Sequence, residues 1–313
     1  MTVVALSGGV GGAKLVSGLA DILPPGELVV VANTGDDFEH LGLHIAPDID
    51  SVFYALAGWN DTERGWGRAG ETWQCMSALG QIGGETWFNL GDQDLALHLE
   101  RTRRLRAGES LSAVTAALCH AAGIATRIIP MSETPVPTVV HTKDQGDLAF
   151  QHYFVRERCE PVVTGFTHRG AAQAEMPRAL AEVRDVEAVI VCPSNPFISI
   201  APILAVPGMR DWLKGLGAPV VAVSPLIGGQ AVKGPTAKMF AELGLDVTNA
   251  GLVAHYGGLL DGLVIDHADG QNVHDLSVAT AVTATLMQTA EDRHRVADIA
   301  LSLVEAIKEH VGS

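Results

Sequence analysis

Short apolar runs alternate along this chain with stretches whose apolar residues recur at helical spacing. Residues 2–7 and 28–32 are continuous apolar runs of strand length, and residues 14–22 between them have the apolar period of a helix. The same order returns later, in apolar runs at residues 187–192, 219–223 and 262–266. Strands that alternate with helices favour a parallel sheet covered by those helices. We therefore predict an α/β fold with a Rossmann-like, mostly parallel sheet and helices on both faces.

The middle of the chain has a different pattern. Two helical stretches, 90–105 and 110–122, are followed by short β-like runs that Pro, Gly and Asp interrupt. These runs lie at residues 126–129, 137–142, 148–150 and 161–166. We predict that residues 60–180 form an inserted, smaller α+β cap or substrate region. Residues 1–60 and 180–313 would then form the nucleotide-binding core.

The composition excludes several classes of protein. The formal net charge of the 313 residues is −15, which disfavours binding to nucleic acid or to an anionic membrane. Apolar runs stay below the roughly 18 residues that a membrane span needs, and the first residues lack the basic segment of a signal peptide. The four cysteines are far apart, as in a reduced protein. We expect a cytoplasmic enzyme with a pocket for a small anionic substrate.

A glycine-rich segment, SGGVGGAK at residues 7–14, joins the first predicted strand to the first predicted helix. Glycines let the backbone approach a ligand closely, and the amides of a helix N-terminus favour an anion. Ala13 separates Gly12 from Lys14, so the segment is not a P-loop, and Lys14 replaces the last glycine of the dinucleotide-binding fingerprint. We predict a phosphate site here, with a tight structural turn as the alternative.

Acidic residues follow the second strand. Asp36 and Asp37 end the segment NTGDD, at the sheet edge where open α/β folds bind ligands. Paired carboxylates beside a phosphate site are typical of a divalent cation, although an Asx turn would also account for them. Asp48 and Asp50 open the next predicted helix. Asp48 would cap this helix, and Asp50 would face the same crevice as the other acids.

A further predicted helix begins near residue 90. Its segment LGDQD contains Asp92, which we interpret from the sequence alone as the N-cap of this helix. The same helix carries His98 and a run of arginines, which is typical of a solvated helix end. The run consists of Arg101, Arg103, Arg104 and Arg106.

Two more loops follow predicted strands. The segment SNPFISI at residues 194–200 offers amide and hydroxyl groups at the carboxyl edge of the sheet. The segment SPLIGGQAVKGP at residues 224–235 repeats the combination of backbone amides, at Gly228 and Gly229, with an ammonium group, at Lys233. We predict that both loops contact a ligand, with simple turns as the alternative.

Together these segments resemble the 2-phospho-L-lactate transferase family of deazaflavin coenzyme (coenzyme F-420) biosynthesis. The matching segments are GGVGGAK (8–14), NTGDD (33–37), HIAPDID (44–50), LGDQDLA (90–96), NPFISI (195–200) and AVSPLIGG (222–229) with KGP (233–235). They run in the order of the family, and the C-terminal third matches mainly in pattern. The resemblance implies a Rossmann-like sheet with an inserted small domain, a homodimer and a requirement for Mg²⁺.

The reaction that the resemblance implies joins a phospho-acyl group to the deazaflavin precursor Fo. The donor would be a guanosine diphosphate adduct of lactate, phosphoenolpyruvate or phosphoglycerate, and GMP would leave. The ribityl hydroxyl of Fo would attack the phosphorus that bears the acyl group, a reaction that needs positioning and charge neutralisation. The sequence leaves the identity of the three-carbon acid open.

The same resemblance, with the positions described above, gives the predicted site. We predict Asp50, Asp36 and Lys14 as catalytic residues and Asp36, Asp37 and Asp50 as metal ligands. Fo would contact Asp50, Asn89 and Asp92, with Asn89 where relatives often carry arginine. The nucleotide and its phosphates would contact Gly8, Gly9, Gly11, Gly12, Lys14, Asn195, Pro196, Ser199, Gly228, Gly229 and Lys233.

Two other functions compete with this one. The first is a regulatory nucleotide-sugar binder of the related gluconeogenesis-factor family, which shares the NTGDD type of loop but lacks the LGDQD segment at 90–94. The second is an NAD(P)-dependent oxidoreductase. A dehydrogenase should have the complete glycine fingerprint and an acidic residue at the end of its second strand, where this chain has Asn33.

Overall fold

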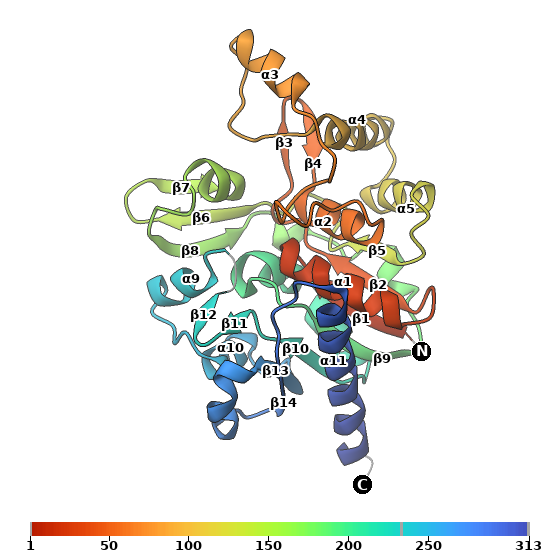
Figure 1. Cartoon of the computed structure of the whole chain (residues 1–313), viewed down its shortest axis with the longest axis vertical. Helices are drawn as coiled ribbons and strands as arrows, with labels where there is room; N and C mark the ends of the chain where they lie inside the picture. The colour runs from red at the N-terminus through yellow and green to blue at the C-terminus, as the bar shows by residue number, and fades with distance from the viewer. Residues whose placement is uncertain (1, 232–233, 312–313) are drawn as a thin grey trace.

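A seven-stranded parallel sheet forms the centre of the protein (Figure 1). The computed structural model describes residues 2–231 and 234–311. The strand order is β14-β13-β10-β9-β1-β2-β5, and each neighbouring pair is parallel. The strands are β1 (Thr2–Ser7), β2 (Leu28–Ala32), β5 (Arg127–Pro130), β9 (Val186–Val191), β10 (Val220–Val223), β13 (Gly262–Asp266) and β14 (Ala279–Thr283).

Helices cover both faces of this sheet because its strands are apolar on both sides. In β1, Val4 and Leu6 pack into one core cluster, while Val3 and Ala5 pack into the other. One face is covered by α1 (Gly9–Ile22), α2 (Pro47–Leu56), α5 (Leu111–Ala121) and α11 (Ala290–Val311). The other face is covered by α7 (Ala201–Ala205), α8 (Met209–Gly215), α9 (Thr236–Glu242) and α10 (Asn249–Tyr256). The predicted α/β fold is confirmed.

The strand order reverses at β1, which lies between β2 and β9. In open α/β sheets, ligands bind outside the carboxyl ends of the strands at such a reversal. The segments that follow β1, β2, β9 and β10 are those in which the sequence places its phosphate, acidic and amide groups. Parallel pairing brings these segments to the same edge of the sheet.

Smaller elements surround this edge. The hairpin of β3 (Phe38–His40) and β4 (Leu43–Ile45) projects from the sheet beside α3 (Gln74–Gln81) and α4 (Asp92–Arg106), at the top of Figure 1. An antiparallel sheet contains β7 (Gly146–Ala149), β6 (Thr138–Thr142) and β8 (Val163–His168). The remaining elements are η1 (His152–Arg156), η2 (Ala171–Gln173), α6 (Arg178–Ala181), η3 (Pro196–Ile200), β11 (Leu226–Ile227), β12 (Gln230–Ala231) and η4 (His267–Asp275).

One strand contradicts the predicted division of the chain. The run at 126–129, which we assigned to the inserted region, forms most of β5, and β5 pairs with β2 at the edge of the main sheet. The core therefore includes a strand from within residues 60–180. The β7-β6-β8 sheet lies outside the main sheet, as the predicted α+β region would. The boundaries at 60 and 180 stay a prediction.

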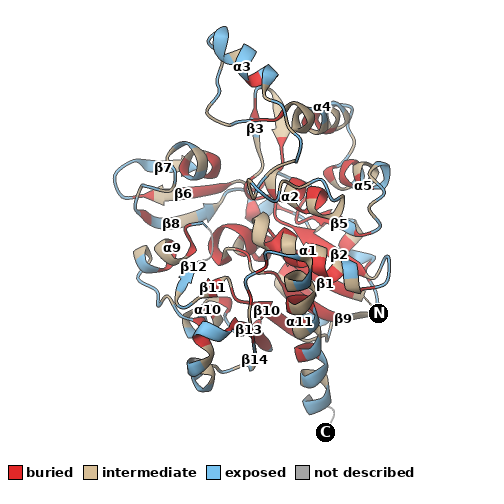
Figure 2. Cartoon of the chain, in the orientation of Figure 1, coloured by how far each residue is buried: buried red, intermediate tan, exposed pale blue. Residues whose placement is uncertain are grey.

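Buried residues are concentrated in the sheet and in the helix faces against it, whereas most of α3 is exposed (Figure 2). Among the described residues, we find no helix with the length and apolarity to cross a bilayer.

Candidate active site

A cavity of about 1190 Å³ opens at the carboxyl edge of the sheet. Its wall combines the loop after β1 with residues of α2, the start of α4, η1 and the loops after β9 and β10. A cavity of this size exceeds the usual 300–1,000 Å³ range for small-molecule sites and has room for a nucleotide beside a second substrate. Of the predicted site residues, the wall includes Gly8, Gly9, Gly11, Lys14, Asp36, Asp50, Asn89, Asn195 and Ser199.

The glycines after β1 are required by close contacts with neighbouring segments. A Cβ on Gly8 would lie 2.5 Å from Asp48 Oδ2, and a Cβ on Gly11 would lie 2.6 Å from the Pro193 carbonyl oxygen. Gly9 has φ +67°, and its amide donates to Asp48 Oδ1 at 2.6 Å. The N-terminus of α1 therefore faces the cavity in a fixed position, where its dipole favours an anion.

Gly12 and Lys14 differ in their relation to the cavity. Gly12 is buried and does not line the cavity. It packs closely against two serines, since a Cβ on Gly12 would lie 2.4 Å from Ser7 Oγ and 2.7 Å from Ser194 Oγ. The structure shows a packing role for Gly12, and its predicted ligand contact stays a prediction. Lys14 lines the cavity, and its Nζ donates to the Met287 carbonyl oxygen at 2.7 Å. The lysine thus joins α1 to the segment before α11 and places its charge beside the glycine loop.

Two buried carboxyl groups, Asp36 and Asp48, meet at the wall of the cavity. Asn33 Nδ2 donates to Asp48 Oδ2 at 2.9 Å and lies 3.5 Å from Asp36 Oδ1. Burial, with repulsion from Asp48 and Asp37, raises the pKa of Asp36 well above its ordinary value. Burial raises the pKa of Asp48 to about 6, although hydrogen bonds from Asn33 and Gly9 lower it. Two crowded oxygen donors of this kind fit a divalent cation, whose charge would relieve their repulsion.

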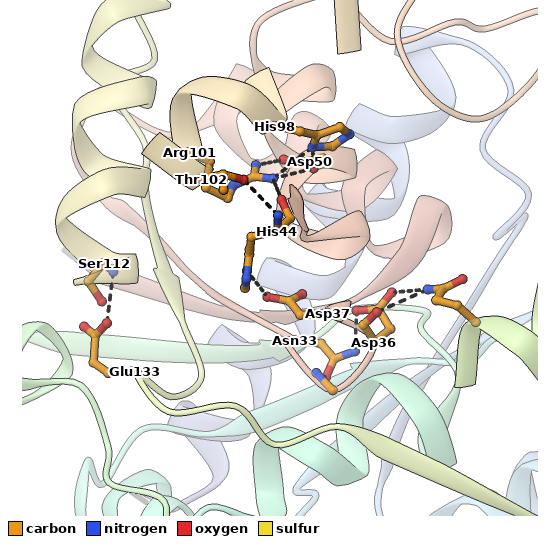
Figure 3. A network of polar contacts seen from close by, with 12 residues as sticks. Asn33, Asp36, Asp37, His44, Asp50, His98, Arg101, Thr102, Ser112 and Glu133 are labelled. Atoms are coloured by element: carbon orange, nitrogen blue, oxygen red, sulfur yellow. Dashed lines mark hydrogen bonds and ion pairs between the residues drawn. The ribbon is translucent and has the colours of Figure 1, made fainter. Parts of the chain in front are cut away.

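The other two predicted metal ligands point elsewhere. Asp37 lies outside the cavity wall, with its Oδ2 3.2 Å from His44 Nε2, and Asp50 binds the Arg101 guanidinium through both oxygens (Figure 3). Asp36, Asp37 and Asp50 are therefore not gathered as one ligand set in the described chain. From the sequence we expect Asp48 to cap α2, but α2 begins without a side-chain cap, and Asp48 contacts the glycine loop instead.

Asp92 has a structural role. Its carboxylate accepts the amides of Gln74 and Cys75, both at 3.0 Å, and so caps α3 rather than its own helix. Glu71 in turn accepts the amides of Gln93 and Asp94, both at 2.8 Å, at the start of α4. Asp92 of α4 thus caps α3, and Glu71, in the segment before α3, caps α4. Asp92 lies outside the cavity wall, so its predicted contact with a substrate is not supported.

In the loop after β9, two of the three predicted contact residues line the cavity. Asn195 Oδ1 accepts the amides of Phe197 at 2.9 Å and Ile198 at 3.3 Å, which caps η3. Its Nδ2 donates to Thr236 Oγ1 at 3.1 Å, so the loop after β9 is joined to the start of α9 beside the cavity. Asn195 and Ser199 line the wall, whereas Pro196 is buried behind it.

The glycine pair after β10 forms a turn. Gly228 and Gly229 connect β11 to β12 with φ values of +59° and +70°, as a two-residue hairpin turn requires. The Gly228 amide donates to Asp269 Oδ2 at 2.9 Å, away from the cavity wall. The structure therefore shows a turn at this pair, and the contact of the pair with a ligand stays a prediction. Lys233 lies outside the described residues.

Aromatic residues that we did not predict form another part of the wall. Those lining the cavity are Trp66, Trp87, Phe88, Phe150 and Phe154. Trp87 and Phe88 have ring centroids 5.7 Å apart, and Phe150 stacks on Phe154 at 5.3 Å. Such a surface suits a flat aromatic ligand. The sequence pattern does not separate these rings from core residues, since Phe150 falls in a predicted β-like run and also packs in the core.

Helices α2 and α4 also face each other through polar side chains at the cavity. Within the described part of the chain, one group of three potential metal ligands lies close together, namely Asp50, Asp94 and His98. Arg101 binds Asp50 and has a guanidinium nitrogen 3.2 Å from His98 Nδ1. Its positive charge disfavours a metal ion at this place. Arg103, by contrast, is an exposed surface residue paired with Glu100, as predicted.

Comparisons with known proteins agree on one family. The family model described as 2-phospho-L-lactate transferase CofD matches residues 3–306. A phosphoenolpyruvate transferase of Streptomyces coelicolor is 40% identical over 318 residues, covering 99% of this chain and 100% of the relative. A 2-phospho-L-lactate transferase of Methanosarcina mazei is 37% identical, covering 95% and 98%. A crystal structure of a UPF0052 family protein from Bacillus halodurans has a TM-score of 0.64 at 14% identity, covering 96% and 98%, and so shares the fold.

Proposed function

The chain belongs to the 2-phospho-L-lactate transferase family, and we infer that it is a transferase of coenzyme F-420 biosynthesis. It moves a phospho-acyl group from a guanosine diphosphate adduct to the ribityl hydroxyl of Fo, and GMP leaves. The observation that carries this inference is the match over residues 3–306, which includes both the core sheet and the surrounding elements. Relatives named for phosphoenolpyruvate and for 2-phospho-L-lactate are similarly identical, at 40% and 37%, so the donor acid is left to experiment.

The donor diphosphate would lie over the N-terminus of α1. This position combines the helix dipole with the Lys14 ammonium group, both at the cavity wall. Lys233 is proposed as a second phosphate contact, although it lies outside the described residues. We propose that Asp36 and Asp48 hold Mg²⁺, because both carboxyls are buried, in contact with each other and open to the cavity. When bound, the ion would neutralise charge on the diphosphate.

We propose that Asp50 acts on the acceptor. In the transfer, the ribityl oxygen forms a bond to the phosphorus that bears the acyl group, and the bond from that phosphorus to GMP breaks. Asp50 would accept the hydrogen bond of the attacking hydroxyl and receive its proton as the new bond forms. The carboxylate lines the cavity on α2, four residues before Tyr54. Lys14 would stabilise the charge on departing GMP.

The aromatic wall supports a place for the tricyclic ring of Fo. Trp87 and Phe88 directly precede Asn89, and all three line the cavity. Asn89 would donate or accept a hydrogen bond where an arginine of other relatives would place a charge. We further propose that the protein is a cytoplasmic homodimer, which size-exclusion chromatography with light scattering would test for the oligomer.

Neither competing function gains support from the site. The structural likeness to the UPF0052 protein, at 14% identity, concerns the fold and not an activity. An NAD(P)-dependent oxidoreductase is disfavoured because Asn33, at the end of β2, donates to buried carboxyls and to the Ile198 carbonyl. The chain therefore lacks, at that position, the acidic side chain that would bind the ribose of NAD.

The decisive experiment is product analysis by mass spectrometry. The purified protein is incubated with Fo, Mg²⁺ and, separately, the guanosine diphosphate adducts of lactate, phosphoenolpyruvate and phosphoglycerate. We expect GMP together with a dehydro or saturated phospho-acyl Fo product from at least one donor. Absence of product from all three, with folded protein and intact donors, would overturn the proposal.

A further inference from the structure

Helices α2 and α4 present matched polar residues to each other beside the cavity. Asp50 and Tyr54 are four residues apart on α2, and Asp94 and His98 are four residues apart on α4. This spacing puts each pair on one face of its helix. The Tyr54 hydroxyl donates to Asp94 Oδ1, and His98 lies between the two acids, with Nε2 3.3 Å from Asp94 and Nδ1 3.6 Å from Asp50.

Arg101 completes this arrangement from behind Asp50. Its two terminal nitrogens donate to the two oxygens of Asp50, one of them at 3.1 Å (Figure 3). The Arg101 side chain is 2% exposed. Asp50 and His98 line the cavity, whereas Arg101 does not. The guanidinium therefore reaches a substrate only through the carboxylate that it holds.

The contacts of Arg101 fix the direction of the Asp50 carboxylate. A bidentate pair between arginine and a carboxylate holds both groups in one plane, which a single contact does not. His98 Nδ1 lies 3.2 Å from the same guanidinium and limits its movement on one side. The third neighbour is the His44 carbonyl oxygen, 3.5 Å from the same nitrogen.

Folding stability alone is a weak reason for this ion pair. The cost of removing both charges from water offsets much of their attraction, so a buried pair often contributes little compared with apolar residues of the same size. Arg101 Nε has no hydrogen-bond partner among the described residues, which adds to that cost. Asp36, Asp48 and Asp94 line the same cavity, and Asp50 would add a further negative charge without Arg101.

We propose that Arg101, supported by His98, is a positioning residue that aims the Asp50 carboxylate at the hydroxyl of the acceptor. The proposal rests on the proposed function, since it assigns Asp50 a role in the transfer. Charge alone would be insufficient, because the fork of two N–H groups sets the direction of the carboxylate. A lysine at the same place would keep the charge and lose the fork.

The test compares Arg101→Lys with the parent enzyme in single-turnover reactions with both substrates saturating. We expect the rate to fall at least about 10-fold, since small misplacements of a reacting group are costly, while donor affinity stays within about 2-fold. In the Asp50→Asn background the same substitution should lower the rate by less than about 3-fold, because its target is already removed. A fall of similar size in both backgrounds would overturn the proposal, as would a rate within about 3-fold of the parent.

Arg104→Lys is the matched control. Arg104 lies on the same helix and forms a bidentate pair with Glu109 outside the cavity wall, so its loss should leave the rate unchanged. If Arg101→Lys does not fold, Asp50→Asn is compared with the Asp50→Asn/Arg101→Gln double variant, which has no unpaired charge. Equal rates support the proposal, and a further loss contradicts it. If the parent enzyme itself forms no product, this result contradicts the proposed function and not the role of Arg101.

Discussion

At the scale of single residues, a substitution at Asp50 tests the proposed chemistry most directly. Asp50→Asn keeps the size of the side chain and removes its charge. We expect the single-turnover rate to fall by about 10²–10⁴-fold, because the amide cannot receive the proton of the hydroxyl. Equilibrium titration of Fo, performed in parallel, separates catalysis from binding. A preserved rate with weakened Fo affinity would make Asp50 a binding residue only.

Lys14 should affect the other substrate. Lys14→Ala removes the ammonium group beside the glycine loop, and we expect the guanosine diphosphate donor to bind more weakly by about 1.5–3 kcal/mol. Fo, which is largely neutral, should bind almost as before. Calorimetric titration of each ligand measures the difference, with Lys214→Ala on α8 as the surface control. Equal losses for both ligands would show that the glycine loop had been assigned to the wrong substrate.

Whether the sequence predicts the role of a residue depends on how far away in the chain its contact partner lies. Asp36, Lys14 and Asn195 could be predicted because each follows a strand of a parallel sheet, which brings it to the ligand edge. Asp48 could not, since its role depends on a contact with Gly9, 39 residues away in the chain. Arg101 resembled a solvated helix residue because its partner, Asp50, lies 51 residues away. Local spacing contains no signal for either contact.

At the scale of elements, the packing of α1 against α11 gives a prediction outside the cavity. A Cβ on Gly18 would lie 2.5 Å from the Arg293 carbonyl oxygen, so the two helices cross at a distance that only glycine permits. We expect Gly18→Ala to lower the free energy of unfolding by about 1–3 kcal/mol, as overpacking does. Urea unfolding measures it. Gly215→Ala, where the added Cβ meets nothing within 4 Å, is the control and should be neutral.

Element pairing also explains what the sequence could not give about the fold. The periodic segments of the core formed the predicted strands and helices, because each buries its apolar side against the sheet. The run that became β5 is short, and its assignment to the main sheet depends on pairing with β2, about 100 residues earlier. The capping of α4 by Glu71 and of α3 by Asp92 is likewise a contact between segments. The apolar pattern of β5 was interpreted correctly, whereas the N-cap role that we assigned to Asp92 in its own helix is wrong. In both cases the partner lies outside the local sequence.

At the scale of the whole molecule, a protein of net charge −15 has to bind a donor that is itself an anion. Only local positive potential can offset this repulsion, and the cavity supplies the α1 N-terminus and Lys14. We expect transfer to stop when EDTA removes divalent cations, since Asp36 and Asp48 would then face the diphosphate with their charges unneutralised. Full turnover in excess EDTA, with metal shown to be negligible, would contradict a role for Mg²⁺.

The two raised pKa values predict how the whole molecule responds to pH. Burial raises the pKa of Asp48 to about 6 and that of Asp36 well above its ordinary value. An acid whose pKa is higher in the folded chain than in the unfolded chain binds its proton more tightly when folded. Without metal, stability should therefore fall as the pH rises from about 4 through about 6. Mg²⁺ competes with these protons, so its affinity should rise over the same interval.

Thermal unfolding with and without Mg²⁺, between pH 5 and pH 7.5, measures both effects. We expect Mg²⁺ to raise the melting temperature more at pH 7.5, where Mg²⁺ at 100 times its dissociation constant adds about 2.7 kcal/mol. Asp48→Asn should weaken this response and, without metal, stabilise the protein at pH 7.5 by relieving repulsion. Asp37→Asn is the matched control, because burial also raises the pKa of Asp37 to about 6 while its carboxylate contacts His44 outside the cavity wall. It should change the pH dependence and leave the Mg²⁺ response intact. An equal loss of the Mg²⁺ response in both variants would return Asp37 to the ligand set that the sequence predicts.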